Sequence, residues 1–590
     1  MRSRYLLVAG KDGRGRSELV RRLASSSGLD LAFSNARLAA LAHSSCACLP
    51  VANSGCILGS LFRRHGPARP VRELTQKEAA SIVQSDGQAL LHSFWGGYIA
   101  AVAGGQSVRI LRDPSGDFPC YHASFGDSTV FASDAELLVS GGIVGASIDF
   151  EEIGRQLFRA FVPASSTALS GIHELLAGFA LRLESNATRL EACWSPWDHV
   201  DPGDSISDRA DRLVRIVRHS VMAWSSTCGR ILLSVSGGLD SSILAACLAR
   251  AGADVVCLTM FTDDPAGDER IFARALCEHL GLPLLERPYR LEDIDICEPM
   301  AVNLPRPRDR AQALAFEHVH DSAASEIGAD AFMTGNGGDH VFGYSQSAAP
   351  VADRYLAEGL GQGTLGALLD VCRQTGCSLA DAAGQAWRLA HSPPGYRVRP
   401  NPLFLDPEFA ASLGPKDWQH PWLSAPADAL PGKAAHIATI LRAQPNLESN
   451  LGDRYPLINP LLSQPIVEAC LEVPTWEWRS GGRDRSLARR AFAADLPRLI
   501  IDRRVKGTPG RFAARLLDHF RNSIRERLLG GRLASRRIID AMALERALAG
   551  ERPVPDLQRV RILELVNAEA WIGHWCDQFQ VDKSLSPIRR

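Results

Sequence analysis

The sequence has little net charge, no long apolar run and no paired cysteine motif. Its 590 residues carry a formal net charge of −1 at pH 7, so nonspecific binding to nucleic acid or to a membrane surface is not expected. No apolar run reaches the length of a membrane span, and the run at 5–10 is too short for a signal peptide. The 14 cysteines include no two Cys-x-x-Cys units, which argues against a structural zinc site. We therefore expect reduced thiols in a cytoplasmic protein.

A chain of this length exceeds the size of one hydrophobic core, so two or more domains are expected. We place the boundary in the polar stretch 198–208, which contains Pro and Gly, and predict domains at 1–203 and 204–590. The first domain is predicted to be mainly β, with helices near 15–25 and 150–160. Its clearest strand patterns are joined by tight turns and lie at 98–103, 107–112, 120–124 and 129–133.

The second domain begins with a helical pattern at 209–224 and then alternates buried strands with helices. Strands are predicted at 230–235, 254–261, 282–289 and 329–335, and helices at 242–252, 268–281 and 311–328. This alternation is typical of a doubly wound α/β sheet with parallel strands. From about residue 350 onward helical patterns dominate, which predicts a helical extension.

The stretch SVSGGLDSS, at 234–242, joins the first strand of this sheet to its first helix. Two glycines, Gly237 and Gly238, allow the backbone to approach an anion closely. The helix that follows presents free N–H groups and the positive end of its dipole. Hydroxyl groups come from Ser236, Ser241 and Ser242. The stretch therefore predicts a cradle for pyrophosphate at the carboxyl end of the strand.

This loop is not a Walker loop, because the G-x-x-x-x-G-K-[ST] spacing and its lysine are missing. It carries Asp240 instead, which would repel phosphate unless a cation lay between them. We therefore expect Mg²⁺ with Asp240 as a ligand. A metal at this place suits an enzyme that releases pyrophosphate. From the loop alone, a Gly-Ser turn with a helix-capping aspartate remains an alternative.

The S-G-G-L-D-S-S motif after an apolar strand resembles the signature of the ATP-pyrophosphatase (PP-loop) enzymes, and the chain resembles their asparagine synthetase class. That class carries a later S-G-E-G-x-D-E-x-F-G-G-Y motif, and here 334–344 reads TGNGGDHVFGY. The resemblance implies that Asp240 and Asp339 share one Mg²⁺ with the triphosphate of ATP. It assigns the following residues to ATP and pyrophosphate: Val235, Ser236, Gly237, Gly238, Leu239, Asp240, Ser241, Ser242, Met260, Thr334 and Gly335. In SLARRAFAADLPRLIIDRRVKG, Lys506 takes the place of the class lysine, which stabilises negative charge during acyl transfer.

The stretch 109–138 resembles the R-D-x-x-G-x-x-P-L-Y-Y…F-A-S-E pattern of the glutaminase domain. The resemblance implies a degenerate Ntn-type glutaminase-like α+β domain, followed by a PP-loop sheet with its helical extension. Glutamine-using members expose a cysteine as the first residue after removal of Met. This sequence has Arg2 and Ser3 there, and its nearest cysteine is Cys46. We expect a scaffold without glutaminase activity, so that the attacking amine belongs to the substrate or arrives free.

Asn336 stands where asparagine synthetase has Glu and where β-lactam synthetase has Tyr as part of its base. Asn cannot accept a proton as a general base. G-N-G-G-D together with the missing cysteine resembles the lasso peptide macrolactam synthetases (lasso cyclases). These adenylate an Asp or Glu side chain of a leader-cleaved precursor peptide. The peptide's N-terminal amine then closes an isopeptide ring and AMP is released.

The partners that this resemblance implies are the precursor peptide, a leader peptidase and a leader-binding protein. The catalytic candidates are Lys506, Asn336 and His340, although a packing or capping role for His340 is favoured over proton handling. One alternative is a small-molecule amide synthetase, either β-lactam-forming or ammonia-using, which Asn336 disfavours. The other is an inactive scaffold, which the presence of Asp240, Asp339 and Lys506 disfavours.

Overall fold

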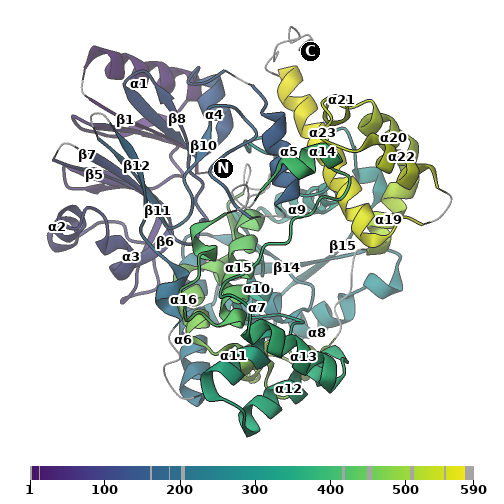
Figure 1. The fold of residues 1–590 in the computed structure, drawn as a ribbon. Helices are drawn as coiled ribbons and strands as arrows, with labels where there is room; N and C mark the ends of the chain where they lie inside the picture. Colours follow the sequence, from purple (N-terminus) through teal and green to yellow (C-terminus); the bar gives the residue numbers. More distant parts are fainter. Residues whose placement is uncertain are drawn as a thin grey trace.

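The computed structural model describes residues 3–11, 13–105, 107–145, 147–159, 162–184, 187–200, 206–414, 419–447, 455–504, 510–550 and 553–578. Figure 1 shows the strands of the amino-terminal part on one side and the helices of the carboxyl-terminal part on the other. None of the described helices is long and apolar enough to cross a membrane. The predicted domain boundary, 203/204, lies outside the described residues, at 201–205.

Two six-stranded antiparallel sheets make up the described amino-terminal part, in the orders β10-β8-β9-β1-β3-β2 and β12-β11-β7-β6-β5-β4. Successive residues of β1 point to opposite faces. Tyr5 and Leu7 therefore enter the core between the sheets, whereas Leu6 and Val8 pack with the residues of α1 and α4. The strands are β1 (Tyr5–Gly10), β2 (Asp30–Ser34), β3 (Leu38–Ala42), β4 (Cys48–Val51), β5 (Gly55–Arg63), β6 (Phe94–Gly104), β7 (Ser107–Arg112), β8 (Tyr121–Phe125), β9 (Ser128–Ala132), β10 (His173–Glu174), β11 (Phe179–Leu183) and β12 (Thr188–Ala192).

The helices of this part are α1 (Arg14–Ser27), α2 (Gln76–Gln84), α3 (Ala89–Ser93), α4 (Ala135–Ser140) and α5 (Phe150–Phe158). The four predicted strands are found as β6 to β9, and the two predicted helices as α1 and α5. The sequence patterns did not predict α2, α3 and α4. The α+β class of the amino-terminal domain is confirmed.

A five-stranded parallel sheet forms the centre of the second part, in the order β15-β14-β13-β16-β17. Its strands are β13 (Arg230–Ser234), β14 (Asp254–Phe261), β15 (Leu284–Pro288), β16 (Ala331–Met333) and β17 (Leu457–Ile458). The chain runs from β13 to β14 on one side and returns to β16 on the other. The strand order therefore reverses between β13 and β16, which is where open α/β sheets bind their ligands.

The helices around this sheet are α6 (Ile206–Ser225), α7 (Leu239–Ala251), α8 (Arg270–Leu280) and α9 (Ala313–Ile327). The predicted order of strands and helices is confirmed, and α7, α8 and α9 each end at a glycine in the left-handed region. Helix α7 begins at Leu239, earlier than predicted, so that Asp240 lies in its first turn. The two-residue strand β17 was not predicted.

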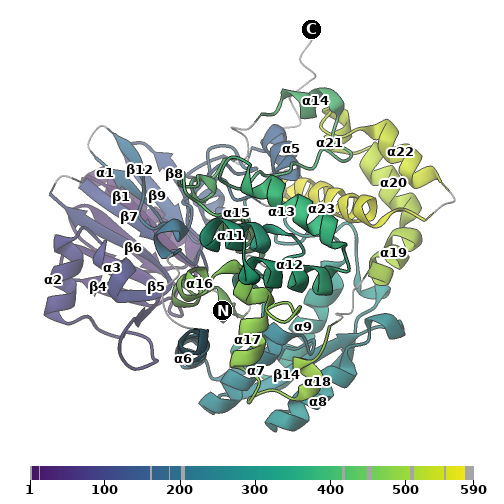
Figure 2. The same cartoon turned by 60° about the horizontal axis from the view of Figure 1, so that its bottom comes forward.

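Helices dominate the rest of the chain, as predicted, and Figure 2 shows α11, α12 and α13 grouped together. The helices are α10 (Gly338–Val341), α11 (Ala349–Glu358), α12 (Gln362–Thr375), α13 (Leu379–Ala390), α14 (Pro407–Ser412), α15 (Pro431–Ala443), α16 (Gln464–Glu472), α17 (Ser486–Ala491), α18 (Arg498–Ile501), α19 (Gly510–His519), α20 (Arg521–Leu529), α21 (Arg532–Ser535), α22 (Ala541–Ala549) and α23 (Asp556–Gln578).

The two parts of the chain share buried contacts. Ile153 and Phe158 of α5 belong to one apolar cluster with Trp571 of α23, and Figure 1 shows the two helices close together. Arg561 of α23 donates a hydrogen bond of 2.8 Å to the carbonyl of Leu157. These contacts between α5 and α23 join the amino-terminal part of the chain to its carboxyl-terminal helices.

Candidate active site

The loop between β13 and α7 is shaped by one glycine with a positive φ. Gly237 has φ 61°, and a Cβ there would lie 2.2 Å from Cβ of Phe272, so no side chain fits. Ser242 Oγ donates to the carbonyl of Gly238 at 2.7 Å, which fixes the start of the helix. Asp240 and Ser242 are buried in the first turn of α7. The loop therefore presents the N-terminus of α7 at the carboxyl end of β13, as predicted.

The second predicted motif follows β16 and lies against this loop. A Cβ at Gly335 would come within 2.6 Å of the Ser241 nitrogen, and one at Gly338 within 2.4 Å of the Asp240 Cβ. Thr334 Oγ1 donates to Asn459 Oδ1 at 2.6 Å, which ties the motif to the end of β17. The two motifs, distant in sequence, thus meet between β13 and β16 as the parallel sheet requires.

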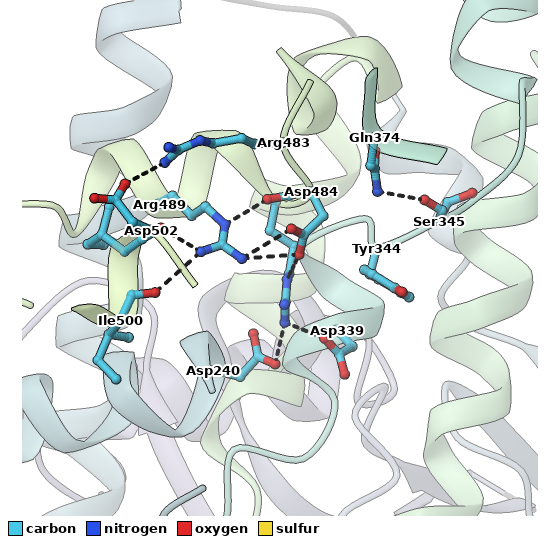
Figure 3. A network of polar contacts seen from close by, with 12 residues as sticks. Asp240, Asp339, Tyr344, Ser345, Gln374, Arg483, Asp484, Arg489, Ile500 and Asp502 are labelled. Carbon is cyan, nitrogen blue, oxygen red and sulfur yellow. Dashed lines mark hydrogen bonds and ion pairs between the residues drawn. The ribbon is translucent and has the colours of Figure 1, made fainter. Parts of the chain in front are cut away.

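Asp240 and Asp339 converge on a single nitrogen atom. Nη1 of Arg485 donates to Asp240 Oδ2 at 2.8 Å and also to Asp339 Oδ1. Figure 3 shows both aspartates turned toward this basic group. Because both carboxylates reach one nitrogen, one cation can contact both, and the pair fits the shared Mg²⁺ that the sequence predicts.

Arg485 was not predicted as a site residue. Its Nε donates to Asp484 Oδ2 at 2.7 Å, and its φ is 52°, an uncommon value for a residue with a long side chain. Burial opposes its charge, but Asp240, Asp339 and Asp484 raise its pKa above the usual value. Asp484 is held in turn by Arg489, whose Nη1 donates to the carbonyl of Ile501 at 2.7 Å.

The three catalytic candidates differ in what the structure says of them. Asn336 lies in the loop after β16, where its N–H donates to Thr334 Oγ1 at 3.1 Å. His340 is on α10, and its Nδ1 is buried without a hydrogen-bond partner among the described residues. Burial lowers the pKa of His340, so its imidazole is neutral at pH 7. Lys506 falls at 505–509, outside the described residues.

The chain on either side of 505–509 is anchored near the nucleotide loop. Before it, Arg503 Nη1 donates to the carbonyl of Ser236 at 2.9 Å, and its guanidinium pairs with Glu269 and lies 3.9 Å above the Phe272 ring. After it, Arg511 pairs with Asp264 at 2.9 Å. The side chain of Asp264 is only 13% exposed, so this pair holds the chain after 505–509 against the end of β14.

Two predicted nucleotide residues lie at the ends of central strands. Val235 is buried and its N–H donates to Leu258 O at 2.8 Å, which continues the β13–β14 pairing. Met260 is partly buried near the end of β14. Trp478 packs beneath the second motif, since a Cβ at Gly343 would lie 2.7 Å from its ring. Trp478 is therefore a core residue.

A pocket of about 550 Å³ lies between the amino-terminal sheets and the synthetase sheet. Its lining includes Gly97 and Asp117 from the amino-terminal part, and Trp224 of α6 and Leu457 of β17 from the second part. Burial and the nearby Asp113 raise the pKa of Asp117 to about 7. Burial raises the pKa of Cys46 to about 12, so this thiol is not a nucleophile at neutral pH.

Comparison with known proteins gives the family. Residues 215–573 match asparagine synthase, and residues 79–194 match a glutamine amidotransferase domain. The chain belongs to the asparagine synthase family. Its two amino-terminal antiparallel sheets are of the glutamine amidotransferase type, and its five-stranded parallel sheet belongs to the asparagine synthase domain.

Individual relatives match this asparagine synthase family member over shorter stretches. The microcin J25-processing protein McjC of Escherichia coli is 28% identical over 134 residues, which is 22% of this chain and 26% of McjC. The tRNA-specific 2-thiouridylase MnmA of Caulobacter sp. (strain K31) is 32% identical over 165 residues, 25% of this chain and 39% of MnmA. The chain thus spans well under half the length of these relatives. Glutamine phosphoribosylpyrophosphate amidotransferase from B. subtilis, complexed with ADP and GMP, has a TM-score of 0.21 and 11% identity, covering 56% of this chain and 90% of that one.

Proposed function

We propose that this protein is a lasso peptide cyclase. It adenylates an Asp or Glu side chain of a leader-cleaved precursor peptide and joins that side chain to the peptide's N-terminal amine. One observation carries the proposal: Asp240 and Asp339 converge on the guanidinium of Arg485 beside the loop proposed to bind pyrophosphate. Asn336 stands where related synthetases carry a residue of their general base. The name of McjC assigns that protein to microcin processing, which supports a peptide substrate.

The first step is formation of an acyl-adenylate. A carboxylate oxygen of the peptide attacks the α-phosphorus of ATP, and the bond from that phosphorus to the pyrophosphate oxygen breaks. The loop at 235–238 and the N-terminus of α7 bind the departing phosphates through backbone N–H groups. Asp240 and Asp339 would hold Mg²⁺, which neutralises phosphate charge when bound.

The second step is aminolysis. The peptide's amine attacks the acyl carbon, the carbon–oxygen bond to AMP breaks, and the amine loses one proton. Asn336 cannot take this proton, and His340 lies with its Nδ1 buried. We assign the proton to the phosphate of the departing AMP. Lys506 is proposed to stabilise the negative charge of the tetrahedral intermediate.

The enzyme's main contribution to this step is positioning. An amine and an acyl-adenylate held in attack geometry react as one molecule, which supplies several kcal/mol of barrier reduction (roughly 7–11 in well-oriented systems). A leader peptidase and a leader-binding protein would supply the cleaved peptide.

Mass spectrometry of a leader-free core peptide tests the proposal, using the peptide encoded beside the gene for this protein. After incubation with the protein, ATP and Mg²⁺, we expect loss of one water from the peptide and one AMP per ring. Asp240→Asn and Asp339→Asn should abolish both, and Asp127→Asn, at an exposed turn, should not. A peptide that stays linear, while ATP is converted to AMP and pyrophosphate when ammonia and a free amino acid are supplied, would instead support a small-molecule amide synthetase.

A further inference from the structure

Arg485 occupies the place between the two carboxylates that are proposed to hold the metal. A single nitrogen of this residue contacts both Asp240 and Asp339, and the Arg485 side chain is only 11% exposed. Asp484 holds the other edge of the guanidinium through Nε at 2.7 Å. The arrangement is a charge-assisted bridge that is buried at Asp240, whose side chain is 10% exposed, and reaches solvent at Asp339, whose side chain is 41% exposed.

The bridge neutralises a pair of like charges. Without a cation between them, the carboxylates of Asp240 and Asp339 would repel each other, and one would separate or take up a proton. Removing one partner from a buried ion network leaves an uncompensated charge, which is strongly unfavourable. Arg485 therefore keeps the two motifs assembled in the protein without nucleotide.

The same position cannot hold the arginine and a metal ion together. A divalent cation that bridges Asp240 Oδ2 and Asp339 Oδ1 takes the place of Nη1 of Arg485, which contacts these same two oxygens. The metal and the guanidinium are therefore alternatives for these two ligands.

The backbone of Arg485 is consistent with a residue that is held in place by its contacts. Its φ of 52° is unfavourable for a residue with a Cβ, and such conformations persist where surrounding contacts compensate for them. The compensating contacts here are the ones that a metal would replace. The ring of Tyr344 lies 5.6 Å from the guanidinium carbon and offers a cation–π contact that needs neither metal ligand.

We propose that Arg485 is an internal counter-ion that competes with the divalent cation. It pairs with Asp240 and Asp339 in the nucleotide-free protein, blocks metal binding there, and must leave both carboxylates when metal and ATP bind together. The inference rests on the metal site of the proposed function. It makes metal binding dependent on nucleotide, since the phosphates supply the ligands that tip the competition.

Titration of the full-length protein with Mn²⁺, followed by the electron paramagnetic resonance signal of free Mn²⁺, tests the inference without turnover. Wild type should bind Mn²⁺ weakly alone and tightly with a non-hydrolysable ATP analogue. Arg485→Gln should bind Mn²⁺ alone at least about tenfold more tightly than wild type, because the competing charge is gone. Arg483→Gln is the matched control, since Arg483 stands two residues before Arg485 but pairs with Asp502 at the surface. It should behave as wild type.

Arg485→Lys keeps the proposal testable if the Gln variant does not fold. The lysine side chain is shorter overall and its compact ammonium is more strongly hydrated, so it pairs less firmly with the two aspartates. The Mn²⁺ affinity of Arg485→Lys without nucleotide should therefore lie between those of wild type and Arg485→Gln. Equal affinities for wild type and either Arg485 variant would overturn the inference while leaving the metal site intact. Absence of Mn²⁺ binding by every variant, even with the analogue, would overturn the metal site itself.

Discussion

Gly338 and Asp240 lie so close together that residue 338 has no room for a side chain. A Cβ at Gly338 would come within 2.4 Å of Cβ and 2.5 Å of Cγ of Asp240. The second motif therefore fixes the position of a carboxylate that belongs to the first. Replacing Gly338 by alanine, which adds one methyl group, tests this contact.

Gly338→Ala should push Asp240 out of place and lower ATP–pyrophosphate exchange by about a hundredfold or more, because small displacements of binding groups cost that much in rate. Thermal unfolding should show a folded protein. Gly366→Ala is the control, since a Cβ there meets nothing within 4 Å. It should keep full exchange and raise stability by about 0.5–1 kcal/mol, as expected inside a helix. Unchanged exchange in Gly338→Ala would contradict the packing argument.

Arg503 links the segment that carries Lys506 to the nucleotide loop. Arg503→Ala removes the hydrogen bond to Ser236 and leaves the partly buried Glu269 without this partner. We expect the KM for ATP in pyrophosphate exchange to rise about tenfold, as the loop loses one anchor. Arg498→Ala, at an exposed position of α18, is the matched control and should leave KM within about twofold. A loss of kcat alone, with KM unchanged, would argue against a role in holding the nucleotide loop.

Asp117 gives a pH-dependent stability. Burial and Asp113 raise its folded pKa to about 7, above the unfolded value of about 3.9. Its contribution to stability is therefore full below about pH 4 and is lost as pH rises toward 7. Asp117→Asn should stabilise the protein at pH 8 by about 2 kcal/mol, roughly half the full shift because the side chain is only partly buried, and by about zero at pH 4.

Urea unfolding of both proteins at several pH values measures this effect. Asp127→Asn, at an exposed turn, should change stability equally little at every pH. A stabilisation by Asp117→Asn that is the same at pH 4 and pH 8 would show that the effect is steric and not electrostatic.

Glu468 of α16 joins the two parts of the chain. It is 6% exposed and accepts hydrogen bonds from Arg64 and from Trp194 Nε1, both in the amino-terminal part. Glu468→Ala leaves Arg64 without this partner, so the free energy of unfolding should fall by about 3–5 kcal/mol. Glu472 lies on the same helix as Glu468 and forms a more exposed ion pair with Arg212 of α6. Glu472→Ala should therefore lower the free energy of unfolding by about 1 kcal/mol or less. Equal losses for the two variants would show that Glu468 is not a junction between the parts.

Sequence reasoning located the elements and residues whose signals are local. The strands β13, β14, β15 and β16 each begin one to three residues after a glycine, and the two aspartates stand in motifs with fixed spacing. Helix α2 was not predicted, although Thr75 and Glu78 form a capping box and the sequence T-Q-K-E has the spacing typical of one. Strand β17 has two residues, too few for any pattern.

Arg485 could not be found in this way. It stands in the run RSGGRDRSLARR among other arginines, and neither its spacing nor its type sets it apart. Its role comes from a positive φ and from two carboxylates supplied by other segments. Both are properties of the assembled tertiary structure.

The neighbouring positions of β13 and β16 in the sheet separate the chemistry from the rest of the domain. Asp240 and Asp339 follow the carboxyl ends of two adjacent strands, β13 and β16. The distance between them is therefore not set by the chain that connects them through β14, α8, β15 and α9. The helices α11 to α13, which follow the second motif along the chain, can therefore gain or lose residues while the distance between Asp240 and Asp339 stays the same. Under the proposed function, this layout lets the substrate change while the pair of carboxylates keeps its arrangement.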